Sequence, residues 1–336
     1  MSLWDALRGL PLVVDSVATE TLAQATPRFT RKTTLVHLHG PGGEGLGEDV
    51  TYDGAEHDRF PVLPLEGSWT LESFSEHVGT LELFAEPPQA PSSVPHRRWA
   101  VESAALDLAL RAAGTTLGEA IGREVSPVRF AVSSRLWQGW LELYPNLRLK
   151  VDPTPDWTDV EFDRLVETQV VDVADLKGYY HGTGVDNPPD AELYRRVVEA
   201  FPDAWIEDAG LTPETDPVLE PHRGRLTWDA PIHSWADVEA LPFPPRCLNC
   251  KPSRFGSLPS LFEFYDRCAE NGIELYGGGQ FELSAGRGQI QLLAALFHPD
   301  GSNDVAPSGF NAAQPAPGLP DSPLELDVMP GFRAAT

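Results

Sequence analysis

The chain has 336 residues, of which 41% are hydrophobic. It contains 25 lysines and arginines and 50 aspartates and glutamates, which gives a formal net charge of -25. This length and hydrophobic content favour two domains over one. A field of this sign repels DNA, RNA and anionic membrane surfaces, so we expect neither a nucleic acid nor a membrane as partner. No run of the sequence reaches the roughly 18 apolar residues that a membrane span needs.

The first residues and the cysteines bear on the cellular compartment. The start, Met1-Ser2-Leu3-Trp4-Asp5, lacks the basic residues and apolar run of a signal peptide, and three cysteines cannot all pair. We therefore expect a cytoplasmic protein. Cys247-Leu248-Asn249-Cys250 has the spacing of a metal or redox site, but zinc needs two further ligands and only Cys268 is near. We interpret these cysteines as buried thiols in a strand.

The first part of the chain has the pattern of an α+β domain. Residues 33–39 alternate between apolar and polar side chains and lead into Gly40-Pro41-Gly42-Gly43, which predicts a strand and a turn, with a second short strand near 48–52. A proline-rich stretch at 84–95 indicates a loop. Apolar residues at helical spacing then predict a helix over 96–113, stopped by Gly114. We assign residues 1–124 to this domain.

From about residue 125 the pattern becomes strand, loop and helix in repetition. It predicts eight short strands, at 128–132, 147–151, 170–175, 204–207, 225–229, 247–251, 273–277 and 304–306. Helices are predicted between most of them, at 158–167, 190–201, 235–241, 258–271 and 288–297. This alternation predicts a TIM-type (β/α) barrel over residues 125–307. The competing fold, a doubly wound open sheet, would need a glycine-rich first turn that is absent. Residues 308–336 form either a return segment against the first domain or a partly disordered tail.

Charged residues stand at the ends of successive predicted strands, where the catalytic groups of a barrel lie. The set comprises Arg148 and Lys150 on strand two, Asp172, Asp175 and Lys177 on strand three, Glu207 and Asp208 on strand four, Asp229 on strand five and Lys251 on strand six. Oxygen ligands from three directions suit Mg²⁺, and a lysine beside such a metal has a lowered pKa and can act as a base. A single charged strand end is usually just solvated, but an ordered set on five strands favours a metal site.

Several segments resemble those of the enolase superfamily, in its muconate lactonizing enzyme and o-succinylbenzoate synthase-like branch. The segment Gly43-Glu44-Gly45-Leu46-Gly47-Glu48 is similar to the turn of that family's N-terminal capping domain. The helix that begins Arg98-Trp99-Ala100 is similar to the family's helix that leads into the barrel. Trp205-Ile206-Glu207-Asp208 resembles its fourth-strand metal ligand, and Lys251-Pro252-Ser253-Arg254 its sixth-strand lysine. Gly277-Gly278-Gly279-Gln280-Phe281-Glu282 is similar to its seventh-strand turn.

The resemblance implies a capping domain before the barrel and a reaction class. Asp175, Glu207 and Asp229 would be the ligands of Mg²⁺, and Lys150 and Lys251 the bases on opposite faces of a small-molecule carboxylate substrate. The implied reaction is removal of the proton α to a carboxylate, leading to racemisation or epimerisation, cycloisomerisation or dehydration. Contacts with the substrate are assigned to Arg148, Lys177, Gln280 and Glu282. A homo-oligomer is compatible with the sequence.

The sequence also departs from the family pattern and leaves alternatives open. Asp175-x-Lys177 stands where the family has Asp-x-Asn, so a cation lies beside the proposed metal, and Asp172 is a rival to Asp175. One alternative is a catalytically degenerate barrel that binds a ligand or a partner, with the ammonium of Lys177 in place of the metal charge. Another is a sugar-acid dehydratase, which the absence of a histidine and aspartate pair on strands six and seven disfavours.

Overall fold

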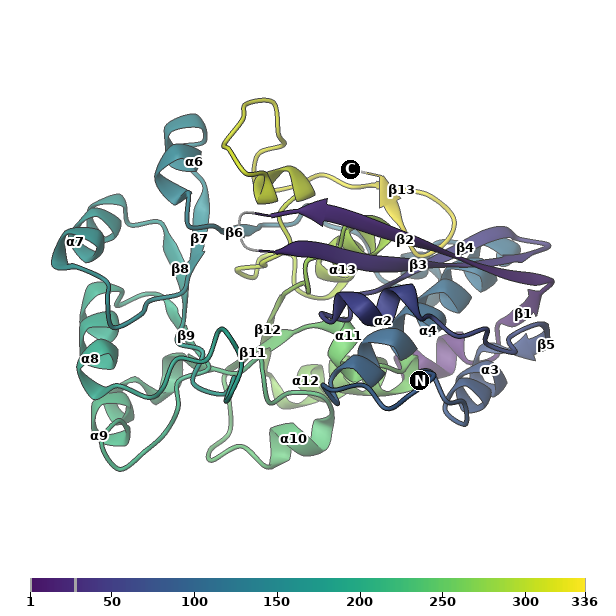
Figure 1. The fold of residues 1–336 in the computed structure, drawn as a ribbon, viewed down its shortest axis with the longest axis horizontal. Coiled ribbons are helices and arrows are strands. Elements are labelled where there is room, and N and C mark those ends of the chain that lie inside the picture. The colour runs from purple at the N-terminus through teal and green to yellow at the C-terminus, as the bar shows by residue number, and fades with distance from the viewer. Residues whose placement is uncertain (1, 27–28, 336) are drawn as a thin grey trace.

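The computed structural model describes residues 2–26 and 29–335 and has two parts of different architecture (Figure 1). The first contains a three-stranded antiparallel sheet in the order β2-β3-β4, with β2 Ser16–Ala25, β3 Thr30–Gly40 and β4 Gly43–Asp49. A small antiparallel pair, β1 Pro11–Val14 and β5 Gly67–Thr70, lies beside it. The strand and turn predicted at 33–43 are thus the β3–β4 hairpin, whereas β1, β2 and β5 were not predicted.

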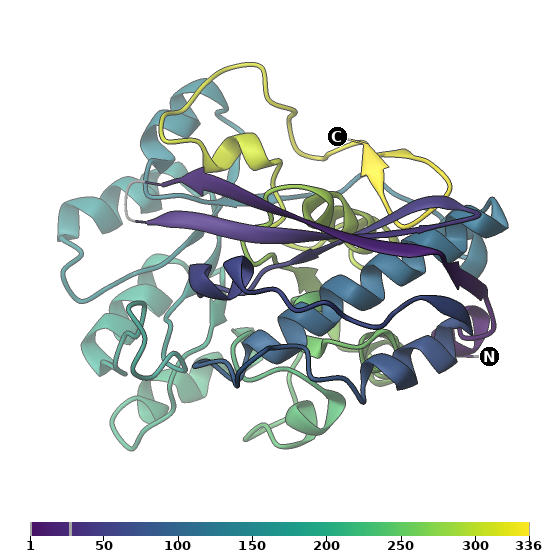
Figure 2. The same ribbon diagram turned by 45° about the vertical axis from the view of Figure 1, so that its right-hand side comes forward.

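One long helix, α4 Ser93–Ala113, packs along β4 and forms the core of this part (Figure 2). The contact is close because Gly45 and Gly47 face the helix, and the carbonyl oxygens of Ala104 and Ala100 occupy the places where their Cβ atoms would lie. Gly114 ends α4 in the left-handed conformation, as the sequence predicts. The short helices of this part are α1 Leu3–Leu7, α2 Gly54–Asp58, α3 Leu71–Val78 and α5 Leu117–Ile121.

The second part is a barrel of parallel strands with helices outside it. A five-stranded sheet runs in the order β10-β9-β8-β7-β6, and β11 pairs with β12. The strands are β6 Ala131–Ser133, β7 Arg148–Val151, β8 Val171–Asp175, β9 Trp205–Glu207, β10 Leu226–Thr227, β11 Cys247–Cys250 and β12 Glu274–Gly277. The helices are α6 Trp137–Leu143, α7 Asp159–Thr168, α8 Ala191–Ala200, α9 Asp216–Leu219, α10 Trp235–Glu239, α11 Pro252–Phe255, α12 Leu258–Asn271 and α13 Ala285–Phe297.

Single contacts close the ring between the two sheets. The amide of Asn249 donates to the carbonyl of Trp228 at 3.1 Å and joins β11 to β10. Isolated bridges pair Gly278 with Asp304 and Phe130 with Asn303, so residues 303–304 fill the eighth position. Of the strand predicted at 304–306, only Asp304 forms a bridge, and Asn303 before it forms the other. The side-chain amide of Asn303 also bonds three neighbouring carbonyls, which holds this segment in place. In the barrel order, β7 holds position two and β11 position six, directly across the ring.

The segment after residue 307 runs back toward the first part. It contains the 3₁₀ turn η2 Ser308–Asn311 and the strand pair β13 Asp327–Val328 and β14 Ala334–Ala335. The amide of Phe332 donates to Asp107 Oδ1 at 2.8 Å, and its ring packs edge-on against Trp99. Within the described residues, this segment is thus fastened to α4.

Two buried side chains of the first part hold the barrel loop before α13. The guanidinium of Arg31 donates to the carbonyls of Gln280 at 2.8 Å and Phe281 at 3.2 Å. The carboxylate of Glu48 accepts from the amides of Leu283, Ser284 and Gly286 at 2.6, 3.0 and 2.9 Å. These bonds fix the two parts relative to each other next to the C-terminal ends of the strands.

Two predictions about the chain as a whole can be compared with the structure. Cys247, Cys250 and Cys268 are free and buried, the first two in β11, which confirms their interpretation as buried thiols. None of the helices in residues 2–26 and 29–335 combines the length and apolar composition that a bilayer crossing requires.

Candidate functional site

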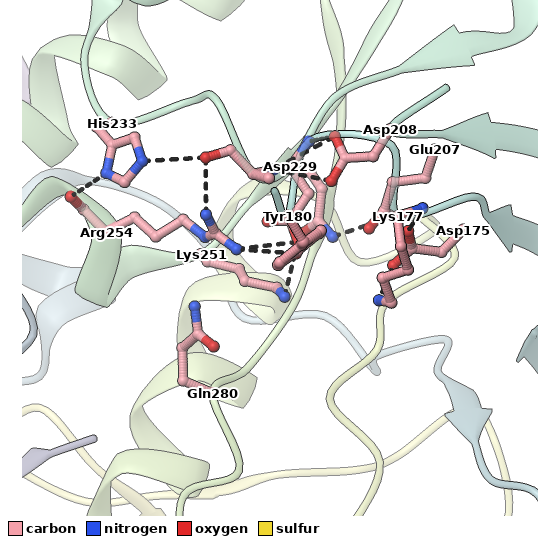
Figure 3. A network of polar contacts seen from close by, with 12 residues as sticks. Asp175, Lys177, Tyr180, Glu207, Asp208, Asp229, His233, Lys251, Arg254 and Gln280 are labelled. Carbon is pink, nitrogen blue, oxygen red and sulfur yellow. Dashed lines mark hydrogen bonds and ion pairs between the residues drawn. The ribbon is translucent and has the colours of Figure 1, made fainter. Parts of the chain in front are cut away.

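Four buried carboxylates gather at the C-terminal ends of three neighbouring strands. Asp175 and Glu207 end β8 and β9 and are register partners, so their side chains leave the sheet side by side. Asp208 follows directly, and Asp229 stands two residues after β10. None of the four has exposed surface. Figure 3 shows them with the polar side chains around them. Such a concentration of negative charge away from water requires cations to stabilise it.

Three of these carboxylates form a compact group. Asp175, Glu207 and Asp208 each offer an oxygen, and these oxygens lie within 4.8 Å of one another. Asp208 turns toward the group because its backbone has φ of 52°. Its two carboxylate oxygens accept from the amides of Asp229 at 2.9 Å and Ala230 at 3.0 Å. The predicted ligands Asp175 and Glu207 are therefore together, but the third member of the compact group is Asp208 instead of Asp229.

Lys150 and Lys177 neutralise one side of the group. Lys150 Nζ lies 2.5 Å from Glu207 Oε1 and 3.2 Å from Asp175 Oδ2. Lys177 Nζ contacts Asp175 and lies 3.5 Å from Asp152 Oδ1. Burial alone would raise the pKa of Asp175, but the two ammonium groups outweigh it and hold that pKa well below its usual range. Burial would lower the pKa of Lys150, but Glu207 and Asp175 raise it, so this lysine carries its proton.

Lys251 lies on the other side, next to Asp229. Its Nζ is 2.8 Å from Asp229 Oδ2, and the same oxygen accepts from the hydroxyl of Tyr180 at 3.0 Å and from Arg254 Nη2 at 3.3 Å. Burial would raise the pKa of Asp229, but Arg254 and Lys251 hold it below its usual range. Lys150 lies in β7, the second strand of the barrel, and Lys251 directly follows β11, the sixth strand. These strands are opposite each other in the ring, so the two amines face each other across the carboxylates.

Glu207 is also held by two hydrogen bonds from side chains inside the barrel, on β11 and β12. Its Oε2 accepts from the hydroxyl of Tyr276 in β12 and from Asn249 Nδ2 in β11, the latter at 3.2 Å. Burial raises the pKa of Glu207 to about 8 despite the ammonium of Lys150. Burial and the charge of Asp229 likewise raise the pKa of Asp208 to about 7. The cations present thus do not fully compensate the carboxylates.

Not every predicted site residue reaches this group. Arg148 donates to Asp172 Oδ1 at 2.7 Å and to the carbonyl of Gln169, and both Arg148 and Asp172 lie near the N-terminal ends of their strands. The structure therefore separates Arg148 from Lys150, and at strand three it places Asp175 in the group of carboxylates and Asp172 outside it. Two residues along a strand are about 6.6 Å apart, which explains the separation of residues that share a face.

Gln280 and Glu282 lie in the loop after β12, at the junction with the first part. Gln280 Oε1 accepts from the hydroxyl of Tyr52 at 3.1 Å. Glu282 folds back on its own loop, with Oε1 accepting from the amide of Gln280 at 2.6 Å and Oε2 at 3.1 Å from Arg287. In the described structure, neither side chain forms a hydrogen bond or ion pair with the four carboxylates, and their contact with substrate stays a prediction.

Sequence reasoning gave no role to Tyr180, Arg254 and Tyr276, and it noted Asp208 as a charged strand end without assigning it as a metal ligand. Asp208 and Arg254 belong to the segments that carry the family resemblance, so their positions were visible although their contacts were not. Tyr180 comes from the loop after β8, and Tyr276 from the middle of a strand, where an aromatic residue is ordinarily read as core. Their hydroxyl contacts depend on tertiary structure alone.

The donor set fits a hard divalent cation. Carboxylate oxygens converge from Asp175, Glu207 and Asp208, and oxygen ligands are those that Mg²⁺ prefers. Asp229 Oδ1 is buried and accepts no hydrogen bond in the described structure, so a further oxygen is free to ligate. Asp175 and Glu207 would belong to either ligand set, with Asp208 or Asp229 as the third carboxylate.

Comparison with solved structures defines the class of fold. Muconate lactonizing enzyme from Pseudomonas putida aligns with TM-score 0.68 at 16% identity over 96% of this chain and 97% of its own. Dipeptide epimerase from Methylococcus capsulatus, complexed with Mg ion, aligns with TM-score 0.65 at 19% identity over 87% and 89%. A mandelate racemase/muconate lactonizing protein from Herpetosiphon aurantiacus aligns with TM-score 0.66 at 16% identity over 97% and 99%. The fold is that of the two-domain barrel proteins of the enolase superfamily.

Family assignment follows from the sequence itself. Residues 5–120 match the N-terminal domain, and residues 124–312 the C-terminal domain, of the family described as Domain of unknown function (DUF8230). Because the second match alone spans more than half of the chain, the protein belongs to this family. No curated protein matches the sequence.

Proposed function

We propose that the protein is a metal-dependent isomerase or lyase that removes the proton α to the carboxylate of a small-molecule substrate. The observation that carries this proposal is the placement of two amines, Lys150 and Lys251, at opposite positions of the barrel with buried carboxylates between them. General bases on both faces of a carbon suit racemisation, epimerisation, cycloisomerisation or syn dehydration. Likeness in fold to racemases, epimerases and cycloisomerases supports the same class.

The proposed cofactor is Mg²⁺, held by Asp175, Glu207 and a third carboxylate from Asp229 or Asp208. When bound, it supplies positive charge where the enediolate oxygens develop negative charge. The chain's own groups exclude water, since all four carboxylates and both amines are buried. Lys150 carries its proton in the present arrangement and so is ready to donate it, whereas the amine of Lys251 lies on the opposite side, where it would take up the proton that the substrate releases.

Exchange of substrate α-protons with solvent deuterium tests the proposal. The assay would use both enantiomers of pooled N-acyl amino acids, dipeptides, sugar acids and succinylbenzoate precursors, with and without Mg²⁺. We expect metal-dependent exchange, with Lys150→Ala losing exchange of one enantiomer and Lys251→Ala losing that of the other. Lys32→Ala is the matched control, because Lys32 pairs with Asp58 in the first part at 2.6 Å. Absence of exchange together with absence of Mg²⁺ binding by calorimetry would overturn the proposal.

A second candidate, a metal-free binding protein on the same fold, is favoured by one observation. Lys177 Nζ contacts Asp175 directly, and its positive φ of 56° directs the chain so that this contact forms. An ammonium group therefore already stands beside a proposed metal ligand. This candidate predicts ligand binding that is independent of Mg²⁺. A sugar-acid dehydratase gains no support, because His233 and His298 bond to backbone carbonyls and to Asn303, respectively.

A further inference from the structure

A cavity of about 540 Å³ opens beside Lys150, outside the group of carboxylates. It lies between the loops that follow β6 and β7, and its walls include Trp137 at the start of α6 and Trp157 before α7. Figure 1 shows α6 and α7 flanking β7 at this end of the barrel. Because Lys150 forms part of the wall, a substrate whose reacting carbon meets this lysine has room to extend into the cavity.

The unpaired polar groups of the cavity are mainly hydrogen-bond donors. Among the described residues, Arg135 makes no ion pair or hydrogen bond, and the indole nitrogens of Trp137 and Trp157 have no acceptor. An indole N–H and a guanidinium can only donate, so a ligand that contacts them must offer acceptor oxygens. Arg135 is exposed and both indoles are half-buried, so such a ligand would replace water at these donors. Two indole side chains in one cavity also present flat apolar surfaces, which favour a planar group and a nearby cation.

The acidic residues of the cavity are mostly occupied. Glu161 accepts from the amide and hydroxyl of Thr158, at 2.7 and 2.9 Å, and so caps α7. Asp152 Oδ1 lies 3.5 Å from Lys177 Nζ. Asp156 is exposed and has no partner in the described chain, so its charge opposes the binding of an anion. The charge of Glu161 acts in the same direction, because its partners in Thr158 are uncharged.

We infer that this cavity is a binding subsite for a planar group that carries a carboxylate, such as an aryl carboxylate. Its carboxylate would pair with Arg135 and its flat face would pack against Trp157 and Trp137. The planar group would be the part of the substrate that extends beyond the reacting carbon, so this assignment rests on the proposed function. Binding to the cavity is nevertheless measurable without turnover.

Metal-free calorimetry with three probes tests the inference: benzoate, cyclohexanecarboxylate of similar size, and benzylamine. Benzoate should bind most tightly, because it alone combines a flat face with negative charge. Arg135→Gln should weaken benzoate binding about fivefold, and Asp156→Asn should strengthen it about twofold, as expected for partly exposed charges. Arg267→Gln, which removes the same charge from α12, is the control and should leave the affinity unchanged.

The opposite pattern would overturn the inference. Tighter binding of benzylamine than of benzoate, with Asp156→Asn weakening it, would make the cavity a site for cations. Equal effects of Arg135→Gln and Arg267→Gln would show that benzoate binds elsewhere. Trp157→Phe tests the indole itself, and it should reduce the change in tryptophan fluorescence that benzoate causes, leaving the part that Trp137 contributes, while the far-ultraviolet circular dichroism stays that of the parent chain. Success here with no α-proton exchange would refute only the proposed function.

Discussion

Lys150 and Lys177 contact the same oxygen, Oδ2 of Asp175. Two ammonium groups on one buried carboxylate oxygen repel each other, and the pair leaves that oxygen little freedom to ligate a metal. Lys150 is in the position that the proposed chemistry requires, whereas Lys177 is the departure from the family pattern. The balance between metal binding and fixed charge at this site therefore depends on Lys177.

Replacing Lys177 by methionine should tighten Mg²⁺ binding at least about tenfold, because removal of a cation at a ligand lowers the electrostatic cost of a divalent ion. Calorimetric titration with MgCl₂ measures the change. Lys32→Met, on the surface of the first part, is the matched control. Weaker binding in Lys177→Met would show instead that Lys177 holds Asp175 in its ligating orientation.

The third metal ligand can be identified by replacing Asp229 and Asp208, one at a time, with asparagine. Asp229→Asn should reduce Mg²⁺ affinity at least about tenfold, since Asp229 Oδ1 has no hydrogen-bond donor and is free to ligate. Asp208→Asn should have the smaller effect, because both oxygens of Asp208 already accept backbone amides. The same calorimetric titration ranks the two variants. A greater loss in Asp208→Asn would assign the site to the compact group of Asp175, Glu207 and Asp208.

Glu48→Ala should lower the free energy of unfolding by about 2–3 kcal/mol, because three amides that precede and begin α13 lose their acceptor in a buried place. Urea unfolding followed by circular dichroism gives this value. Glu76→Ala, at an exposed position of α3, should change it by less than about 0.5 kcal/mol. Equal effects of the two substitutions would mean that water replaces the carboxylate at the domain junction.

His298 should make the protein less stable as the pH falls. Burial lowers the pKa of His298 to about 4, while the unfolded chain keeps a value near 6.5, so the unfolded state binds a proton first. Stability is complete above the unfolded value and is lost as the pH falls toward the folded value, by about 2 kcal/mol between pH 7 and pH 5. His298→Gln should reduce the difference in the free energy of unfolding between pH 7 and pH 5 by about 2 kcal/mol, as measured by urea unfolding at the two pH values. His181→Gln, at an exposed position, should keep the slope of the parent chain.

Local patterns in the sequence predicted most of the elements that build the barrel. The helices at 258–271 and 159–168 begin at Ser257 and Thr158, whose side chains cap them, and such signals lie within a few residues. The eighth strand could not be predicted correctly, because residues 303–304 are placed by side-chain bonds of Asn303 and by Phe130, far away in sequence. A short apolar run alone does not distinguish a strand from two isolated bridges.

The structure brings some of the predicted site residues together and places others elsewhere, for physical reasons. Asp175, Glu207, Asp229, Lys150 and Lys251 lie in one region because parallel strands end at the same side of a barrel. Arg148 was misplaced because the period of two fixes the face of a strand but not the height of a residue along it. Asp208 joins the compact group only through its positive φ, which nothing in the residue types announces.

Arg31 and Glu48 have a consequence for how this protein can diversify. Both recognise only main-chain atoms of the barrel loop, namely the carbonyls of Gln280 and Phe281 and the amides of Leu283, Ser284 and Gly286. Peptide groups are the same whatever side chain they carry, so most positions of this loop are free to mutate without loosening the joint. Gly286 is the exception, since a Cβ there would lie 3.0 Å from Glu48 Oε2. Side chains at the rim of the site can thus change during evolution while the bonds that join the two parts stay the same.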